Sequence, residues 1–455
     1  MQSIPEHAFT TDRPTTLRRA RSPVAFLPEV VGVAPDRDGA ALVDIAIADG
    51  RVASVAPAGS GPALPGDVDL GGRHLWPTLV DVHAHLDKGH IVERTPNPDG
   101  THFGALTATA EDRTRFWRRD DLIRRMEFGL ACAEAHGVSA IRTHLDSQEE
   151  QGPETWAAFG EVSVAWKNRV ALQAVALAPM DIFRGPYAEQ LADIVAETGG
   201  LMGGVTRATG SRIEDGLADL DALLDRLFAL ASDRDLDVDL HVDETNYAAG
   251  ATLPDIARAT IRNGYEGRVT CGHCCSLALQ DEATLAEHVR LVRDAGISIV
   301  TLPTVNMYLQ DRQAGRTPRW RGVTPVTELR AAGVRVAVAG DNCRDPFYAY
   351  GDHDMLDTFR QGVKILHLDH PYGDAAALAG PAPAAIMGLS DHGAIRPGAP
   401  ASFIVMNAWS MDQVLARPQS DRIVVRNGRR LAGGLPSYAT LVAAEPGRPT
   451  EHAAA

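Results

Sequence analysis

Long apolar runs are missing from this 455-residue chain. None approaches the roughly 18 residues that a membrane-spanning helix needs, and the N-terminal segment lacks the apolar core of a secretory signal. We therefore predict a cytoplasmic protein without a membrane partner. The polar residues 1–22, which contain prolines and arginines, are expected to form a disordered leader.

Positive charge is also scarce, because 44 lysine and arginine residues face 59 aspartate and glutamate residues and leave a net charge of −15. A surface this negative repels the phosphates of nucleic acids and of anionic lipids. We therefore expect a small-molecule partner and no nucleic acid. The sequence is compatible with a homo-oligomer but does not require one.

Cysteine is sparse and odd in number, with five residues placed unevenly along the chain. This argues against a disulfide framework and for a reducing compartment. Cys271 and Cys274 form a C-x-x-C pair, but no second pair follows at the spacing of a four-ligand zinc site. The pair therefore predicts no structural zinc.

Short apolar runs alternate with stretches of helical periodicity through the middle of the chain. The apolar runs cover 78–82, 138–143, 170–177, 201–206, 238–241, 268–271, 297–302 and 334–339. Helical candidates lie at 120–136, 188–198, 217–231, 253–262, 281–295 and 326–332. The alternation predicts an α/β protein with a (β/α)8 TIM barrel over 77–390. A doubly wound sheet is the alternative fold, but no glycine-rich phosphate loop follows a strand to favour it.

Short β-type segments flank this region on both sides. They lie at 43–47, 51–56 and 74–76 before it, and at 402–406 and 422–425 after it, where the turn Asn427-Gly428 follows. Strands from the two ends of the chain can share one small structure. We predict that 23–76 and 391–435 form a small β-sandwich and that 436–455 form a C-terminal tail.

Histidines and acids fall at the ends of the predicted barrel strands, where barrel enzymes place their chemistry. His83 and His85 point to the same side of an extended strand because side chains alternate. His241, His273 and Asp341 end later strands. A single histidine at a strand end ordinarily has a structural role. Here a structural role would have to apply independently at several strand ends, which favours one shared site. Three histidines and an aspartate suit a divalent cation that keeps one open position.

These residues resemble the amidohydrolase superfamily. The resemblance rests on the H-x-H of His83 and His85, on the later His241 and His273, and on the final Asp341. Further stretches are similar to the cytosine deaminase branch, which includes pterin deaminases and N-isopropylammelide hydrolases. They are Arg142-Thr-His-Leu-Asp146, Asn306, Arg319-Trp-Arg-Gly322 and Asp345-Pro346.

The resemblance implies a distorted barrel and one Zn²⁺ or Fe²⁺ ion per chain. It implies that His83, His85, His241 and Asp341 hold the metal. Glu244, three residues after His241, is then the general acid and base. His273 binds the attacking water, and Asp341 also moves a proton. The alternative for Glu244 is a carboxylate that stabilises the start of the next helix.

Lysine is nearly absent, with Lys88, Lys167 and Lys364 as the whole set. Binuclear members of the superfamily, such as hydantoin hydrolases, bridge two metals with a carboxylated lysine from the fourth strand. The stretch 199–206 has no lysine. This disfavours the ring-opening amidases and favours one metal.

The substrate side departs from the cytosine deaminase pattern. The stretch 175–181 lacks the glutamine that pairs with cytosine, and Asn342 replaces a second aspartate. Lys88 is shared with ammelide-type hydrolases, and we expect Lys88 and Asn342 to bind substrate. The sequence therefore predicts a hydrolytic deaminase of an amino-oxo N-heteroaromatic ring of the cytosine, pterin or isoguanine kind. The alternatives are an N-alkylamino-triazine hydrolase and a catalytically silent metal-binding barrel.

Overall fold

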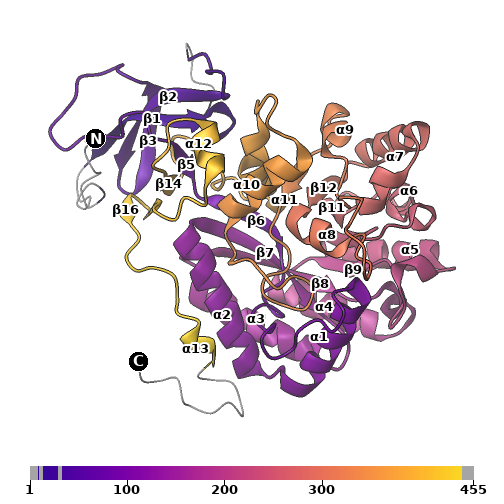
Figure 1. Ribbon diagram of the computed structural model, residues 1–455. Helices are drawn as coiled ribbons and strands as arrows, with labels where there is room; N and C mark the ends of the chain where they lie inside the picture. The colour runs from indigo at the N-terminus through magenta and orange to yellow at the C-terminus, as the bar shows by residue number, and fades with distance from the viewer. Residues whose placement is uncertain (1–8, 10–13, 29–32, 443–455) are drawn as a thin grey trace.

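Parallel strands organise the larger part of the molecule, shown as a computed structural model in Figure 1, which describes residues 9, 14–28 and 33–442. Eight such strands occur in these residues. They are β6 (Leu79–Ala84), β7 (Val138–Asp146), β8 (Ala171–Leu177), β9 (Met202–Val205), β10 (Val238–Val242), β11 (Val269–His273), β12 (Ser298–Thr301) and β13 (Val336–Val338). Each overlaps a predicted run, so the predicted α/β fold with a parallel sheet is confirmed.

The parallel strands form two sheets, with the orders β6-β7-β8 and β13-β12-β11-β10-β9. Isolated parallel bridges lie between the sheets at both edges. Val175 and Pro179 bridge to Leu201 and Val205 on one side, and Ala84 bridges to Asp341 on the other. The arrangement is TIM-barrel-like.

Helices surround these sheets, and α1 lies over the cavity at the strand ends (Figure 1). They are α1 (His102–Phe116), α2 (Arg119–His136), α3 (Gly152–Trp166), α4 (Tyr187–Thr198), α5 (Leu220–Ser232), α6 (Leu253–Arg262), α7 (Glu282–Asp294), α8 (Pro303–Leu309), α9 (Val326–Ala331), α10 (Met355–Leu366) and α11 (Pro381–Met387). In α6, Leu253, Ile256, Ala257 and Thr260 are buried, which is the spacing of one helix face. No helix among the described residues is long and apolar enough to cross a membrane.

A buried aspartate aligns the first and last parallel strands. The carboxylate of Asp81 accepts hydrogen bonds from the backbone N–H of His83 at 3.3 Å and of Gly340 at 3.0 Å. The backbone N–H of Asp341 in turn donates to the carbonyl of His83 at 2.8 Å. These bonds fix the ends of β6 and β13 relative to each other, and both ends carry predicted metal ligands.

Two four-stranded sheets lie beside the barrel-like part. One has the order β3-β2-β1-β4, with β1 (Thr15–Pro23), β2 (Ala40–Ala48), β3 (Arg51–Pro57) and β4 (Val68–Asp69). The other has the order β16-β15-β14-β5, with β5 (Leu75–Pro77), β14 (Phe403–Val405), β15 (Ile423–Arg426) and β16 (Arg429–Arg430). One apolar cluster contains residues of both sheets, such as Ile45 and Phe403. The turn Asn427-Gly428 joins β15 to β16 with both residues at positive φ, as a tight hairpin requires.

The predicted disordered leader is wrong for residues 15–22. They belong to β1, which pairs with β2 over most of its length and with β4 at Leu17 and Arg18. The physical reason is the alternation in this segment, since Leu17 and Ala20 are fully buried while the charged residues stay at the rim. Residues 1–8 and 10–13 of that prediction lie outside the described part of the chain.

The C-terminal segment runs from the end sheets down to α2 (Figure 1). It contains α13 (Ala439–Val442), which packs against α2. A further short helix, α12 (Met411–Ala416), lies between β14 and β15. Residues 443–455 of the predicted tail lie outside the described residues.

Because β1 is part of the sheet and of its apolar cluster, its buried apolar residues contribute to the free energy of unfolding. We expect Leu17→Ala to reduce the free energy of unfolding by about 2–5 kcal/mol, because Leu17 is fully buried and its loss leaves a cavity. Urea unfolding followed by circular dichroism measures this. Leu64→Ala is the matched control, since Leu64 is 61% exposed. Equal free energies of unfolding for the two variants would contradict the assignment of β1 as a packed strand and would support the predicted disordered leader.

Candidate active site

Four of the predicted metal ligands meet at one buried point. His241 Nε2 lies 3.2 Å from Nε2 of both His83 and His85. The Oδ1 atom of Asp341 lies 3.2 Å from His85 Nε2 and 3.6 Å from His83 Nε2. These side chains come from the ends of β6 and β10 and from just beyond β13, so the parallel strands bring together what the sequence separates.

These spacings fit a divalent cation. Four donors arranged tetrahedrally about 2.1 Å from an ion are about 3.4 Å from one another. Both oxygens of Asp341 are buried without a hydrogen-bond donor. A buried carboxylate is stable only beside compensating positive charge. The donor set of imidazoles and one carboxylate suits Zn²⁺ or Fe²⁺.

The protonation states agree with metal binding. Burial lowers the pKa of His83, His85 and His241 well below 6.5, with neighbouring cationic groups adding to the effect. These imidazoles are therefore neutral and offer lone pairs. Burial also raises the pKa of Asp341, as do the nearby carboxylates of Glu244 and Asp345. A cation beside Asp341 reverses this effect.

Glu244 lies beside the donor cluster in a chain of polar contacts. Its Oε1 atom is 3.6 Å from His273 Nδ1 and 3.3 Å from Asn306 Nδ2. Its Oε2 atom is 3.3 Å from His102 Nε2. Burial raises the pKa of Glu244, but the two histidines and the Asn306 amide lower it more, so the net shift is downward. The group is a carboxylate at neutral pH, as a proton acceptor must be.

The position of Asn306 decides the role of His273. The amide nitrogen of Asn306 faces Glu244, which can only accept, so the NH₂ group is on this side. The same nitrogen lies 2.9 Å from His273 Nδ1. Nδ1 is therefore the acceptor, and the proton of His273 lies on Nε2, which is buried and lacks a partner. His273 itself forms a close group of possible metal donors with His83, His241 and Asp341, a group that does not include His85. A protonated Nε2 donates a hydrogen bond and does not bind a metal, so the prediction that His273 is not a ligand depends on this tautomer.

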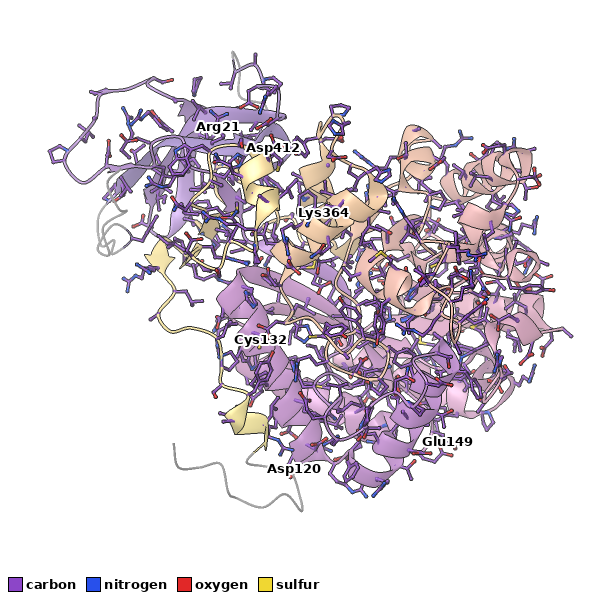
Figure 2. All side chains as sticks on the ribbon, in the orientation of Figure 1. Arg21, Asp120, Cys132, Glu149, Lys364 and Asp412 are labelled. Atoms are coloured by element: carbon purple, nitrogen blue, oxygen red, sulfur yellow. The ribbon has the colours of Figure 1, made fainter. Side chains whose placement is uncertain are left out.

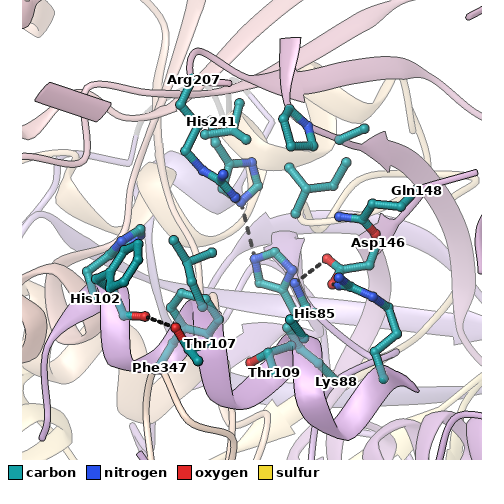
Figure 3. A pocket seen from close by; sticks show the side chains of 18 of the residues that line it. His85, Lys88, His102, Thr107, Thr109, Asp146, Gln148, Arg207, His241 and Phe347 are labelled. Carbon is teal, nitrogen blue, oxygen red and sulfur yellow. Dashed lines mark hydrogen bonds and ion pairs between the residues drawn. The ribbon is translucent and has the colours of Figure 1, made fainter. Parts of the chain in front are cut away.

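The donor cluster opens into a cavity of about 750 Å³. Figure 3 shows His85 and His241 facing each other, with Lys88 and Asp146 on one side and His102 and Phe347 on the other. All predicted site residues except His83 line this cavity. They are Lys88, His85, His241, Glu244, His273, Asp341 and Asn342.

Lys88 is held in place within the cavity wall. Its ammonium nitrogen donates to Asp146 Oδ1 at 2.6 Å, and Arg113 donates to the other oxygen of Asp146, also at 2.6 Å. Burial lowers the pKa of Lys88, but Asp146 and Asp87 raise it more, so the lysine is charged. Asn342 donates to Asp345 Oδ2 at 2.7 Å, which orients its amide.

Sequence reasoning missed His102 and Arg113. Both lie on α1, in a segment that had no strand-end motif, and His102 contacts Glu244 while Arg113 contacts Asp146. Arg207 also lines the cavity and is 9% exposed. No spacing rule marks these residues, because they reach the site from a helix and a loop far from the metal ligands in sequence.

Comparison with known proteins decides the family. A family model described as an amidohydrolase family matches residues 129–432. This chain belongs to the amidohydrolase family. The membership confirms the family predicted from the strand-end residues, and with it a hydrolase that acts on C–N bonds.

This amidohydrolase has several curated relatives. It is 50% identical over 414 residues to a pterin deaminase of Rhizobium rhizogenes, in a match that covers 90% of this chain and 93% of that protein. It is 26% identical over 394 residues to an N-isopropylammelide isopropyl amidohydrolase of a Pseudomonas species, covering 85% and 92% of the two chains. The confirmed branch is therefore that of the amidohydrolase deaminases.

Solved structures of the same fold agree with the architecture. A 5-methylcytosine deaminase of Klebsiella pneumoniae aligns with a TM-score of 0.75 and 23% identity, covering 93% of this chain and 98% of that one. An N-isopropylammelide isopropylaminohydrolase of Burkholderia multivorans aligns with a TM-score of 0.71 and 24% identity, covering 92% and 97%. At these identities the likeness concerns the fold.

The donor cluster predicts the effect of removing one ligand. His83→Ala and His241→Ala should each lose about one equivalent of divalent metal per chain, because three donors remain around an ion that needs four. Elemental analysis of the purified, desalted variants measures this. His288→Ala, on α7, is the control and should keep its metal. Unchanged metal content in both cluster variants contradicts this assignment.

Proposed function

We propose that this amidohydrolase is a metal-dependent deaminase that hydrolyses the exocyclic amine of a bicyclic aminopyrimidinone of the pterin kind and releases ammonia. The observation that carries the proposal is the placement of Glu244 and His273 beside the metal donors at the floor of a large cavity. The 50% identity to a pterin deaminase supports the substrate class. A silent metal-binding barrel has no need for the acid-base residue that this site retains.

His83, His85, His241 and Asp341 would hold the metal. When bound, a divalent ion supplies a nucleophile at neutral pH by lowering the pKa of water. The Glu244 carboxylate accepts one water proton as oxygen attacks the ring carbon, and delivers it to the adjacent ring nitrogen. His273 donates from Nε2 to the attacking oxygen. Asp341 moves the second proton to the amine, which leaves as ammonia while the carbon–oxygen double bond forms.

The cavity favours a fused ring over a single pyrimidine. Its volume of about 750 Å³ exceeds what one six-membered ring fills. The edge of an aminopyrimidinone presents a carbonyl and ring N–H groups. We propose that Lys88 donates to the carbonyl, that Asp146 accepts from an N–H, and that the oriented amide of Asn342 contacts the ring.

The finer architecture belongs to the same proposal. We propose that the parallel strands form a closed, distorted (β/α)8 barrel, which the isolated bridges at Ala84 and Val175 support. We also propose that the two end sheets form a β-sandwich, which their shared apolar cluster supports. In such a barrel the proposed metal ligands would lie at the carboxyl ends of the strands.

Glu244→Gln tests the acid-base role. Glutamine keeps the size of the side chain but cannot accept and return a proton. We expect the metal to be retained and kcat to fall at least about 100-fold. Steady-state ammonia release together with elemental analysis measures both. Glu111→Gln is the matched control, because Glu111 also lines the cavity but is exposed. Near-normal turnover of the Glu244 variant contradicts the role.

A substrate panel tests the reaction. We expect ammonia from a pterin, little from cytosine, and alkylamine release from N-isopropylammelide only if the triazine alternative holds. Lys88→Met should lower kcat/KM for the pterin more than it lowers metal content, with the exposed Lys364→Met as control. The stretch 175–181 lacks the glutamine that pairs with cytosine. A kcat/KM for cytosine of about 10⁶ M⁻¹s⁻¹ or more would therefore contradict the expectation that cytosine turnover needs this glutamine.

A further inference from the structure

A second group of metal-binding side chains lies outside the active site. His90, Cys343 and His353 place one donor atom each within 4.8 Å of one another. Their exposed fractions are 5%, 3% and 7%. Neither ring nitrogen of His90 has a hydrogen-bond partner, and neither does Nε2 of His353. Buried nitrogens of this kind have lost their water and gained no partner, which indicates a ligand that the three side chains share.

We propose that His90, Cys343 and His353 bind a zinc ion with a structural role. A thiolate with two imidazoles is a soft donor set that suits Zn²⁺ and disfavours Mg²⁺ and Ca²⁺. The backbone N–H of His353 donates to the sulfur of Cys343, as backbone donors do at metal-bound thiolates. On binding, the ion replaces the thiol proton, which leaves to solvent.

A small cavity and a second buried thiol lie beside the group. A cavity of about 50 Å³ borders Cys343 and His353, though not His90, and it is large enough to hold a water molecule beside these two donors. Cys132 of α2, labelled in Figure 2, is buried and interacts with both Asp352 and Cys343. Cys132 is not among the donor atoms that lie within 4.8 Å of one another, so the fourth position of a tetrahedral site is left to a water molecule.

The location of the group explains what the ion does. His90 follows the strand-end segment that carries His83 and His85, and the backbone N–H of His90 donates to the carbonyl of Cys343 at 3.2 Å. Cys343 follows Asp341 by two residues. An ion here joins the two segments that carry most of the catalytic metal ligands, and so limits their movement.

The C-terminal segment closes the group from outside. The ring of Tyr438 lies 6.4 Å from that of His90 and 5.4 Å from that of Phe128, between ring centroids. Its hydroxyl donates to Asp352 at 2.9 Å. This cover excludes solvent, which is typical of a structural site and not of a catalytic one.

The proposed zinc is additional to the single catalytic ion that the sequence predicts, so its test counts ions in separate variants. The full-length protein, saturated with Zn²⁺ and desalted, should contain about two ions per chain by elemental analysis. Cys343→Ser and His353→Gln should each contain about one, and so should His83→Ala. Cys271→Ser and His288→Gln are the matched controls and should contain two.

Cobalt distinguishes the two sites without reference to activity. The catalytic donors include no sulfur, so a thiolate-to-cobalt charge-transfer band in the near ultraviolet reports only the proposed site. We expect this band in the wild-type protein and in His83→Ala, and its loss in Cys343→Ser. If Cys343→Ser does not fold, the spectrum of His353→Gln is compared with that of the wild type. We then expect the band in the wild type and its loss in His353→Gln. A Co²⁺-saturated wild-type protein without the band, or a folded Cys343→Ser protein that keeps both ions, overturns the proposal.

Discussion

The active site depends on one carboxylate that is kept away from water. Asp341 is 1% exposed and is surrounded by imidazoles and by other acids. Neutral imidazoles cannot balance a buried negative charge, and the free energy of isolating such a charge is large. The proposed divalent cation between His83, His85, His241 and Asp341 would balance this charge. It would also account for the short distances between the ring nitrogens of the neutral histidines, since each nitrogen would offer its lone pair to the ion.

The backbone at two strand ends adopts an unusual conformation next to these side chains. His273 and Asp341 both adopt positive φ, at 69° and 68°, which non-glycine residues avoid unless their surroundings enforce it. Each lies where a parallel strand stops and a loop begins. The turn directs the side chain inward instead of along the strand. The hydrogen bonds of Asp81 to the backbone of His83 and Gly340 hold the segment before Asp341 against the end of β6.

The sequence predicted the fold correctly where the hydrophobic periodicity extended over a long segment. The prediction failed where the periodic segment was short. The helix predicted at 253–262 matches α6 at both ends, because its apolar residues repeat at helical spacing over the whole length. The prediction for segment 15–22 was wrong, because three arginines, Arg18, Arg19 and Arg21, hid its alternating burial. These arginines pair with acids farther along the chain, as Arg19 does with Asp69. A single segment does not reveal such partners.

The sequence by itself determined the parallel α/β fold and the family, and it placed the proposed metal ligands and Glu244 at strand ends, because these residues follow a spacing that strand geometry converts directly into position. The tertiary structure alone decided what approaches from elsewhere. It brought His102 to Glu244, Arg113 to Asp146, and His90 to Cys343 and His353. These pairs are separated by 33 to 263 residues of chain and lie on helices and loops without a repeating pattern. Their proximity is a property of packing, and no local periodicity encodes it.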